Sequence, residues 1–354
     1  MMMVMMMISK PNFKKAEKEA YLLLETANVR ELPVKVKKLA KLFPNLKIKT
    51  YSWYADKWRL TIDEVCEFAD SDEGCCWYIK SQDKYLILYN DQVENIGRVR
   101  WTIAHELGHY ILKHNEKSNK AIFARSSLSE TEYDVFEKEA NCFARTILAP
   151  LPVLSNLGNI DVPLISDLCH ISWEASSHII SFLQRGREMG ISYSQKTKPI
   201  KLFSNYIYKL NNKHFCRECR SEIIKKNIKF CPVCGASTLY KTIRILGVEK
   251  DMLYNKIELD DEGRAITCPT CENEEVHDGT FCKICGVTVI NKCGNMEYWN
   301  GELQWECGEL AEGNARFCTK CGHATTFFEN KILRTWQAEK EEMEEQEQFM
   351  NSPF

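Results

Sequence analysis

The chain has 354 residues, more than one ordinary domain holds, so two or more folding units are expected. Its formal net charge of -2 neither indicates nor excludes a nucleic-acid partner. No run of about 18 apolar residues is present, so no membrane span is predicted. The apolar start MMMVMMMISK is too short for a secretory signal. Seventeen cysteines without a predicted export signal indicate metal binding rather than disulfides, and a cytoplasmic location.

The first 190 residues mix helical and strand patterns. Residues 12–43 carry apolar side chains at helical spacing. The segments LKIKTYS and KYLILYN predict strands, and the second is a candidate edge strand for an extended substrate. Helices are predicted for residues 99–113 and 130–148, and two shorter ones within 162–185. The predicted fold class is therefore α+β.

The helix predicted for 99–113 contains the segment HELGH. In a helix, His105 and His109 lie one turn apart on the same face, and Glu106 lies beside the first. This is the H-E-x-x-H pattern, in which two imidazoles bind zinc and the glutamate serves as general base. The rest of this helix is largely apolar, which favours an internal site over two surface histidines. Tyr110 and Tyr133 are both eligible to stabilise an oxyanion, and the sequence does not choose between them.

A catalytic zinc needs a third protein ligand. A histidine at position 115 would complete a longer motif, but that residue is Asn115, and His114 is one residue out of register and is predicted to lie at the surface. The segment FEKEANCFA offers glutamates instead. Glu137 and Asn141 share a helix face, so Glu137 is predicted to bind zinc while Asn141 hydrogen-bonds a ligand histidine. Glu139 falls on another face and is predicted to be solvated.

Residues 8–190 resemble the ImmA/IrrE family of zinc metallopeptidases. The segments that carry the resemblance are ELPVKVKKLA, YLILYND, RVRWTIAHELGHYIL and EKEANCFARTILAP. It implies a gluzincin-like fold, one catalytic zinc, and limited cleavage of a regulatory protein, often a helix-turn-helix repressor. In this chain the family's zinc ligands fall on His105, His109 and Glu137, and its catalytic glutamate on Glu106. Residues 164–184 resemble a helix-turn-helix, but packing of this helix pair against the catalytic core is favoured over DNA binding.

Twelve of the seventeen cysteines lie between residues 216 and 321, in three sets that predict zinc ribbons. Ribbon 1 (211–240) and ribbon 2 (264–290) each pair two C-x2-C motifs, a strong signal for zinc held by four thiolates. Ribbon 3 (291–326) is irregular, because Gln304 stands where its first C-x2-C would begin, and the nearest spare cysteine is Cys293. Closed four-cysteine sites are structural, and such small modules need the metal to fold. The predicted ligand sets are Cys216, Cys219, Cys231 and Cys234; Cys268, Cys271, Cys282 and Cys285; and Cys293, Cys307, Cys318 and Cys321.

Charge is unevenly distributed in this second half. Residues 201–250 hold eleven basic against three acidic side chains, and residues 251–354 hold nine against twenty-one. Ribbon 1 sets its basic residues around Phe215 and Phe230, so it is a candidate for binding nucleic acid or an acidic partner. A solvated basic knuckle, docked on the chain's own acidic tail (331–354), is an equally good interpretation. That tail is predicted to be a solvated helix or disordered.

Two functions from different classes follow. The first is a cytoplasmic zinc endopeptidase with one catalytic and three structural zincs, whose ribbons select or position a protein substrate such as a repressor. The second is a regulatory binding protein that uses the peptidase fold and the ribbons for docking, without proteolysis. The presence of the complete HELGH set favours the enzyme.

Overall fold

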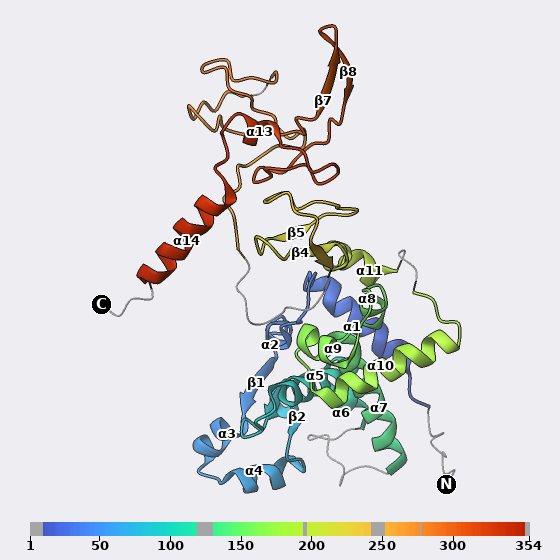
Figure 1. Ribbon diagram of the computed structural model, residues 1–354. Helices are drawn as coiled ribbons and strands as arrows, with labels where there is room; N and C mark the ends of the chain where they lie inside the picture. The colour runs from blue at the N-terminus through green and yellow to red at the C-terminus, as the bar shows by residue number, and fades with distance from the viewer. Residues whose placement is uncertain (1–9, 119–129, 194–196, 242–251, 277, 351–354) are drawn as a thin grey trace, which may run out of the picture. The chain divides into compact units, whose positions relative to one another are not determined.

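A computed structural model describes residues 10–118, 130–193, 197–241, 252–276 and 278–350 (Figure 1). The chain divides into two compact units, Met1–Tyr208 (unit 1) and Lys209–Phe354 (unit 2). Unit 1 combines helices with a small sheet and confirms the α+β class. Among the described residues, no helix is both long and apolar enough to cross a membrane.

The sheet of unit 1 has three strands: β1 (Leu46–Thr50), β2 (Gly74–Ile79) and β3 (Lys84–Tyr89). The order is β1-β3-β2, with β1 parallel and β2 antiparallel to β3. The prediction of KYLILYN as an edge strand is therefore wrong. Its residues from Tyr85 to Tyr89 are all buried, which is typical of a strand paired on both sides and covered on both faces. The edge strands are β1 and β2, and β2 was not predicted.

Helices α5 (Ile96–Leu112) and α7 (Glu130–Leu148) form the centre of unit 1 and match the two helices predicted there. Asn95 caps α5 by accepting a hydrogen bond from the backbone N–H of Arg98 at 3.0 Å. A side chain at Gly108 would lie 3.3 Å from the Cα atom of Ala140. The glycine thus lets α7 pass close to α5, at the level of the HELGH segment.

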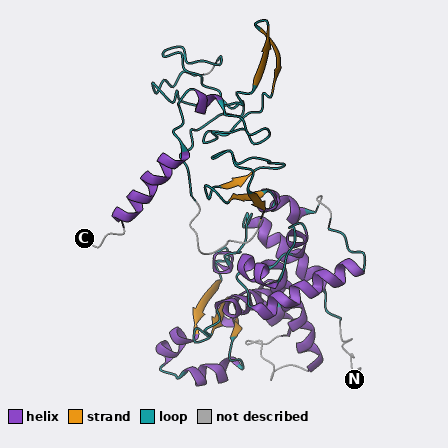
Figure 2. Cartoon of the chain, viewed as in Figure 1, coloured by secondary structure: helices purple, strands orange, loops and turns teal. Residues whose placement is uncertain are grey.

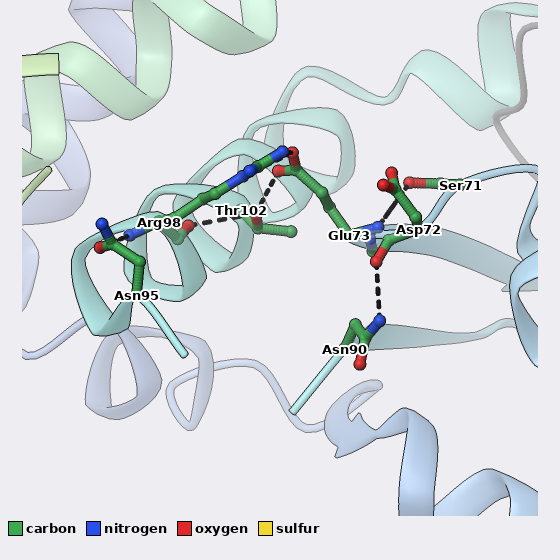
Figure 3. A network of polar contacts seen from close by, with 8 residues as sticks. Ser71, Asp72, Glu73, Asn90, Asn95, Arg98 and Thr102 are labelled. Atoms are coloured by element: carbon green, nitrogen blue, oxygen red, sulfur yellow. Dashed lines mark hydrogen bonds and ion pairs between the residues drawn. The ribbon is translucent and has the colours of Figure 1, made fainter. Parts of the chain in front are cut away.

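A polar network fastens the start of α5 to the end of the sheet (Figure 3). The carboxylate of Glu73, just before β2, pairs with Arg98 and accepts a hydrogen bond from the Thr102 hydroxyl at 3.0 Å. The side chain of Asn90, just after β3, donates to the backbone carbonyl of Asp72 at 2.8 Å. These contacts fix the position of α5 along the sheet, and with it the positions of its histidines.

The other helices of unit 1 lie around α5 and α7 or, like α3 and α4, against the sheet (Figure 1). The helix pair predicted within 162–185 is α9 and α10, and its connecting turn packs on α5. Arg100 of α5 donates to the carbonyl of His170 in that turn at 2.9 Å, and a Cβ at Gly97 would lie 2.5 Å from the backbone nitrogen of Ser172. The pair thus packs against the core. The helices of unit 1 other than α5 and α7 are α1 (Phe13–Thr26), α2 (Val36–Ala40), α3 (Tyr51–Trp58), α4 (Ile62–Ala69), α6 (His114–Ser118), α8 (Leu151–Ser155), α9 (Val162–Cys169), α10 (Trp173–Glu188), α11 (Lys198–Leu202) and α12 (Ser204–Asn211), which ends in unit 2.

The described part of unit 2 consists mainly of loops, as Figure 2 shows, with short strands, the end of α12 and two helices of its own. Its larger sheet has the order β5-β4-β6, and its hairpin pairs β7 with β8. Small clusters built around the cysteines replace a single large core. The elements are β4 (Lys213–Cys216), β5 (Glu222–Ile224), β6 (Leu239–Lys241), β7 (Met296–Trp299), β8 (Glu302–Glu306), α13 (Thr326–Glu329) and α14 (Trp336–Met350).

The acidic tail is not a solvated segment along its whole length. Helix α14 takes up Trp336–Met350 of the tail, and Trp336 and Met343 pack against the cluster of ribbon 1. The carboxylate of Glu339 pairs with Arg316 of ribbon 3 at 2.8 Å, and both side chains are buried. The helix therefore docks on the ribbons through one face, while most of its other described glutamates remain exposed.

Candidate active site and metal centres

The structure brings His105, His109 and Glu137 together. The Nε2 atoms of the two histidines lie 2.9 Å apart, and each lies 3.2 Å from one carboxylate oxygen of Glu137. Ligands at about 2.0–2.1 Å from a tetrahedral zinc are separated by about 3.3 Å. The observed spacing fits three corners of such a tetrahedron, and among the described residues Glu106 and Glu139 do not belong to this ligand group.

The electrostatics of these three residues also suit a cation. Burial lowers the pKa of His109 to about 3, so this imidazole is neutral, as a metal ligand must be. Although burial opposes it, contact with the two histidine rings holds the pKa of Glu137 well below its ordinary value. Burial also disfavours the charged form of His105, but Glu137 raises its pKa to about 9. A metal ion at this position competes with that proton.

Glu106 lies in a different environment from Glu137. Its side chain is 7% exposed, and burial raises its pKa to about 7, against the opposing effects of His105 and of a backbone hydrogen bond from Cys76. Strand β2, which supplies Cys76, therefore holds the carboxylate in place beside the histidines. A carboxyl group with a pKa near neutral is suited to accept and return a proton.

Asn141 lies where the helix spacing predicts. Its side-chain oxygen is 3.1 Å from Nδ1 of His105. Because Nε2 of His105 faces the ligand group, Nδ1 carries the proton and donates to Asn141, a tautomer assigned here from the hydrogen-bond network.

Two predictions near the site are wrong. His114 is 0% exposed rather than a surface residue, and Glu139 is 6% exposed rather than solvated. Helix α5 ends at Leu112, and Lys113 adopts a left-handed conformation with φ of 59°, so the register of a continuous helix does not apply to His114. Its Nδ1 lies 2.9 Å from Nδ1 of His109, and its Nε2 lies 3.1 Å from Glu139 Oε2.

Of the two tyrosines considered for the oxyanion, Tyr110 has its hydroxyl engaged elsewhere. It donates to Asn45 Oδ1 at 2.7 Å, and its ring packs against Phe43 and Tyr85. Tyr110 is thereby held by the residue that precedes β1.

The three cysteine sets assemble as the spacing predicts. Four sulfurs at about 2.3 Å from a tetrahedral zinc are separated by about 3.8 Å. The Sγ–Sγ distances that join the first two cysteines of each set to the last two range from 3.4 Å for Cys216–Cys234 to 4.0 Å for Cys307–Cys318. All three groups therefore fit closed tetrahedral sites.

The four cysteines of ribbon 3 meet in space although their spacing in the sequence is irregular. The residues between Cys293 and Cys307 form the hairpin of β7 and β8, and the backbone N–H of Cys307 donates to the carbonyl of Asn295 at the base. Cys293 Sγ lies 3.4 Å from Cys321 Sγ. The hairpin is thus an insertion that leaves the four ligands together.

Much of the basic, aromatic face of ribbon 1 has partners within unit 2. Lys213 pairs with Glu222, and Lys225 pairs with Glu309 of ribbon 3 at 3.0 Å. Phe215 is buried, and the ring of Phe230 lies against Gly322. Two lysines and both phenylalanines that the sequence analysis considered for a partner are thus in contact with other residues of unit 2.

Residues 73–158 match the model of the IrrE N-terminal-like domain, Peptidase_M78. The chain contains an IrrE N-terminal-like domain. The match extends from Glu73 in the network of Figure 3 to the turn after α8, and it includes the HELGH segment and Glu137. No curated protein matches the chain.

Proposed function

We propose that the protein is a zinc-dependent endopeptidase that makes limited cleavages in a regulatory protein. The observation that carries this proposal is the contrast between the metal groups. Each ribbon offers four thiolates, whereas His105, His109 and Glu137 offer three ligands, with the buried carboxylate of Glu106 next to His105. Three protein ligands are typical of catalytic zinc sites, where the fourth position is left to water or substrate.

When bound, zinc polarises the scissile carbonyl and lowers the pKa of a coordinated water to about 7. Glu106 then accepts the proton of the attacking water and delivers it to the leaving nitrogen. Asn141 keeps His105 in the tautomer that presents Nε2 to the site.

The proposed substrate is a helix-turn-helix repressor, in keeping with the resemblance of residues 8–190 to the ImmA/IrrE family. We assign substrate or partner recognition to unit 2, because its metal groups are closed and because the hairpin of β7 and β8 exposes Tyr298, Trp299 and Trp305. The twelve ligand thiols need a reducing compartment, for which we propose the cytoplasm.

Docking without proteolysis is the competing function, and it would use the same exposed aromatic side chains of the hairpin. Both functions require a partner to be bound by unit 2. Only the peptidase requires Glu106 to transfer a proton.

Comparative proteomics of cells that express wild type or Glu106→Gln tests the proposal. The amide keeps the size of the side chain but cannot accept the proton, and the loss of general acid–base catalysis costs about 10²–10⁴-fold in rate. Wild type should generate a new protein N-terminus that is missing with Glu106→Gln and present with the control Glu94→Gln, which alters an exposed glutamate. A biological effect that persists in Glu106→Gln, with zinc still bound, would contradict the peptidase and support docking.

A further inference from the structure

A buried chain of hydrogen-bonding groups leads away from the candidate zinc site. Glu139 Oε1 accepts the backbone N–H of Asn12 at 2.7 Å, and Glu139 Oε2 lies 3.1 Å from His114 Nε2. His114 Nδ1 in turn lies 2.9 Å from His109 Nδ1. The chain thus joins α1, α7 and the segment after α5 to one ligand histidine.

The protons of this chain have one consistent arrangement. The ionised carboxylate of Glu139 only accepts hydrogen bonds, so His114 Nε2 must be the donor. A neutral His114 then has a lone pair on Nδ1, which accepts the N–H at Nδ1 of His109. The proton of His109 is thereby kept on Nδ1, and its Nε2, which faces Glu137, presents a lone pair.

We propose that His114 and Glu139 are positioning residues that hold His109 in its metal-binding tautomer and orientation. This inference rests on the proposed zinc site. Mutation of the residue that hydrogen-bonds a ligand histidine typically lowers metal affinity by about 10–100-fold. Here a second histidine carries the effect of the carboxylate to the ligand.

The substitution Glu139→Gln keeps the size of the side chain but should reverse the donor and acceptor roles along this series of hydrogen bonds. The backbone N–H of Asn12 requires the amide oxygen on its side, which turns the amide NH₂ toward His114 Nε2. A neutral His114 must then accept there and carry its proton on Nδ1. This displaces the proton of His109 to Nε2, the atom that must bind the metal.

The test is zinc binding by the full-length protein in a series of zinc buffers, with three-zinc and four-zinc species counted by native mass spectrometry. Glu139→Gln should weaken the fourth zinc by about 10–100-fold. Glu17→Gln is the matched control, because it alters another α1–α7 contact, the ion pair of Glu17 with Arg145. This control should bind the fourth zinc as wild type does. Thermal unfolding of both variants reports any general loss of stability.

Nitrogen-15 spectra of the histidine rings give a readout that a general packing role would not move. In wild type, His114 should carry its proton on Nε2 and His109 on Nδ1, and Glu139→Gln should move the proton of His114 to Nδ1. Unchanged zinc affinity in Glu139→Gln, or a wild-type His114 with its proton on Nδ1, would overturn the inference.

Neither measurement uses a peptide substrate, so the inference and the peptidase proposal can fail separately. A wild type that binds four zincs through this chain but cleaves nothing refutes only the peptidase. A wild type that takes up no fourth zinc overturns both.

Discussion

Replacing Glu339 with alanine is expected to release helix α14 from the remainder of unit 2. The carboxylate of Glu339 lies 2.8 Å from Nη2 of Arg316, and their side chains are 6% and 0% exposed. The guanidinium also donates to two backbone carbonyls, those of Arg334 at 2.5 Å and Asn314 at 3.1 Å. The substitution removes the only counter-charge that the structure places on this buried cation among the described residues.

Removing one partner of a buried ion pair typically costs about 3–5 kcal/mol. Because two carbonyl contacts to Arg316 remain, we expect a value near the lower end, about 3 kcal/mol. That corresponds to a decrease of roughly 100-fold in the equilibrium constant for docking of α14. The packing of Trp336 and Met343 on ribbon 1 then has to hold the helix without the ion pair.

Hydrogen exchange of the backbone amides of residues 336–350, followed by mass spectrometry, measures this release. Glu339→Ala should accelerate their exchange, whereas the double variant Arg316→Met/Glu339→Leu should keep them protected, since an apolar pair often replaces a buried ion pair without loss. The control is Glu342→Ala, which removes an exposed ion pair with Arg334 and should cost less than about 1 kcal/mol. Unchanged protection in Glu339→Ala would refute the buried-pair reasoning.

Three further predictions concern the metal groups and one close helix contact. Glu137→Ala should leave three zincs per chain by native mass spectrometry, and a count of four would contradict the ligand assignment. Gly97→Ala should lower the midpoint of thermal unfolding, because its Cβ would lie 2.5 Å from Ser172 N and overpacking costs about 1–3 kcal/mol. The control Gly186→Ala in α10 should raise the midpoint, because a Cβ there would have no neighbour nearer than 3.9 Å. Cys282→Ser should abolish exchange protection throughout ribbon 2, whose cluster holds few apolar side chains besides the cysteines; retained protection would mean that the ribbon folds without its metal.

The sequence predicted the candidate site where chemistry follows local spacing. Helical periodicity places His105 and His109 on one face, and the same rule selects Glu137 over Glu139 as the third ligand. The cysteine sets are equally local, since each C-x2-C motif forms one small turn. Only the closure of ribbon 3 through Cys293 depends on a longer insertion.

The errors arise where tertiary packing decides. Helix phase shows that Glu139 faces away from Glu137, but not that the opposite face is covered by the start of α1, where Asn12 donates to Glu139. The burial of His114 depends on the left-handed conformation of Lys113, which a lysine in the sequence does not predict. The segment GCCWYI lacks the alternation of a half-exposed strand, and its pairing with β3 decides that it is β2.

Diffraction from crystals of the full-length protein, recorded just above the zinc absorption edge, would locate every bound zinc ion. The proposed ligand groups predict four anomalous peaks per chain, three of them within the cysteine groups. The fourth should lie about 2.0–2.2 Å from Nε2 of His105, Nε2 of His109 and a carboxylate oxygen of Glu137, with Glu106 outside the ligand sphere. Three peaks alone, or a fourth peak bound by Glu106 or Glu139, would contradict this ligand assignment.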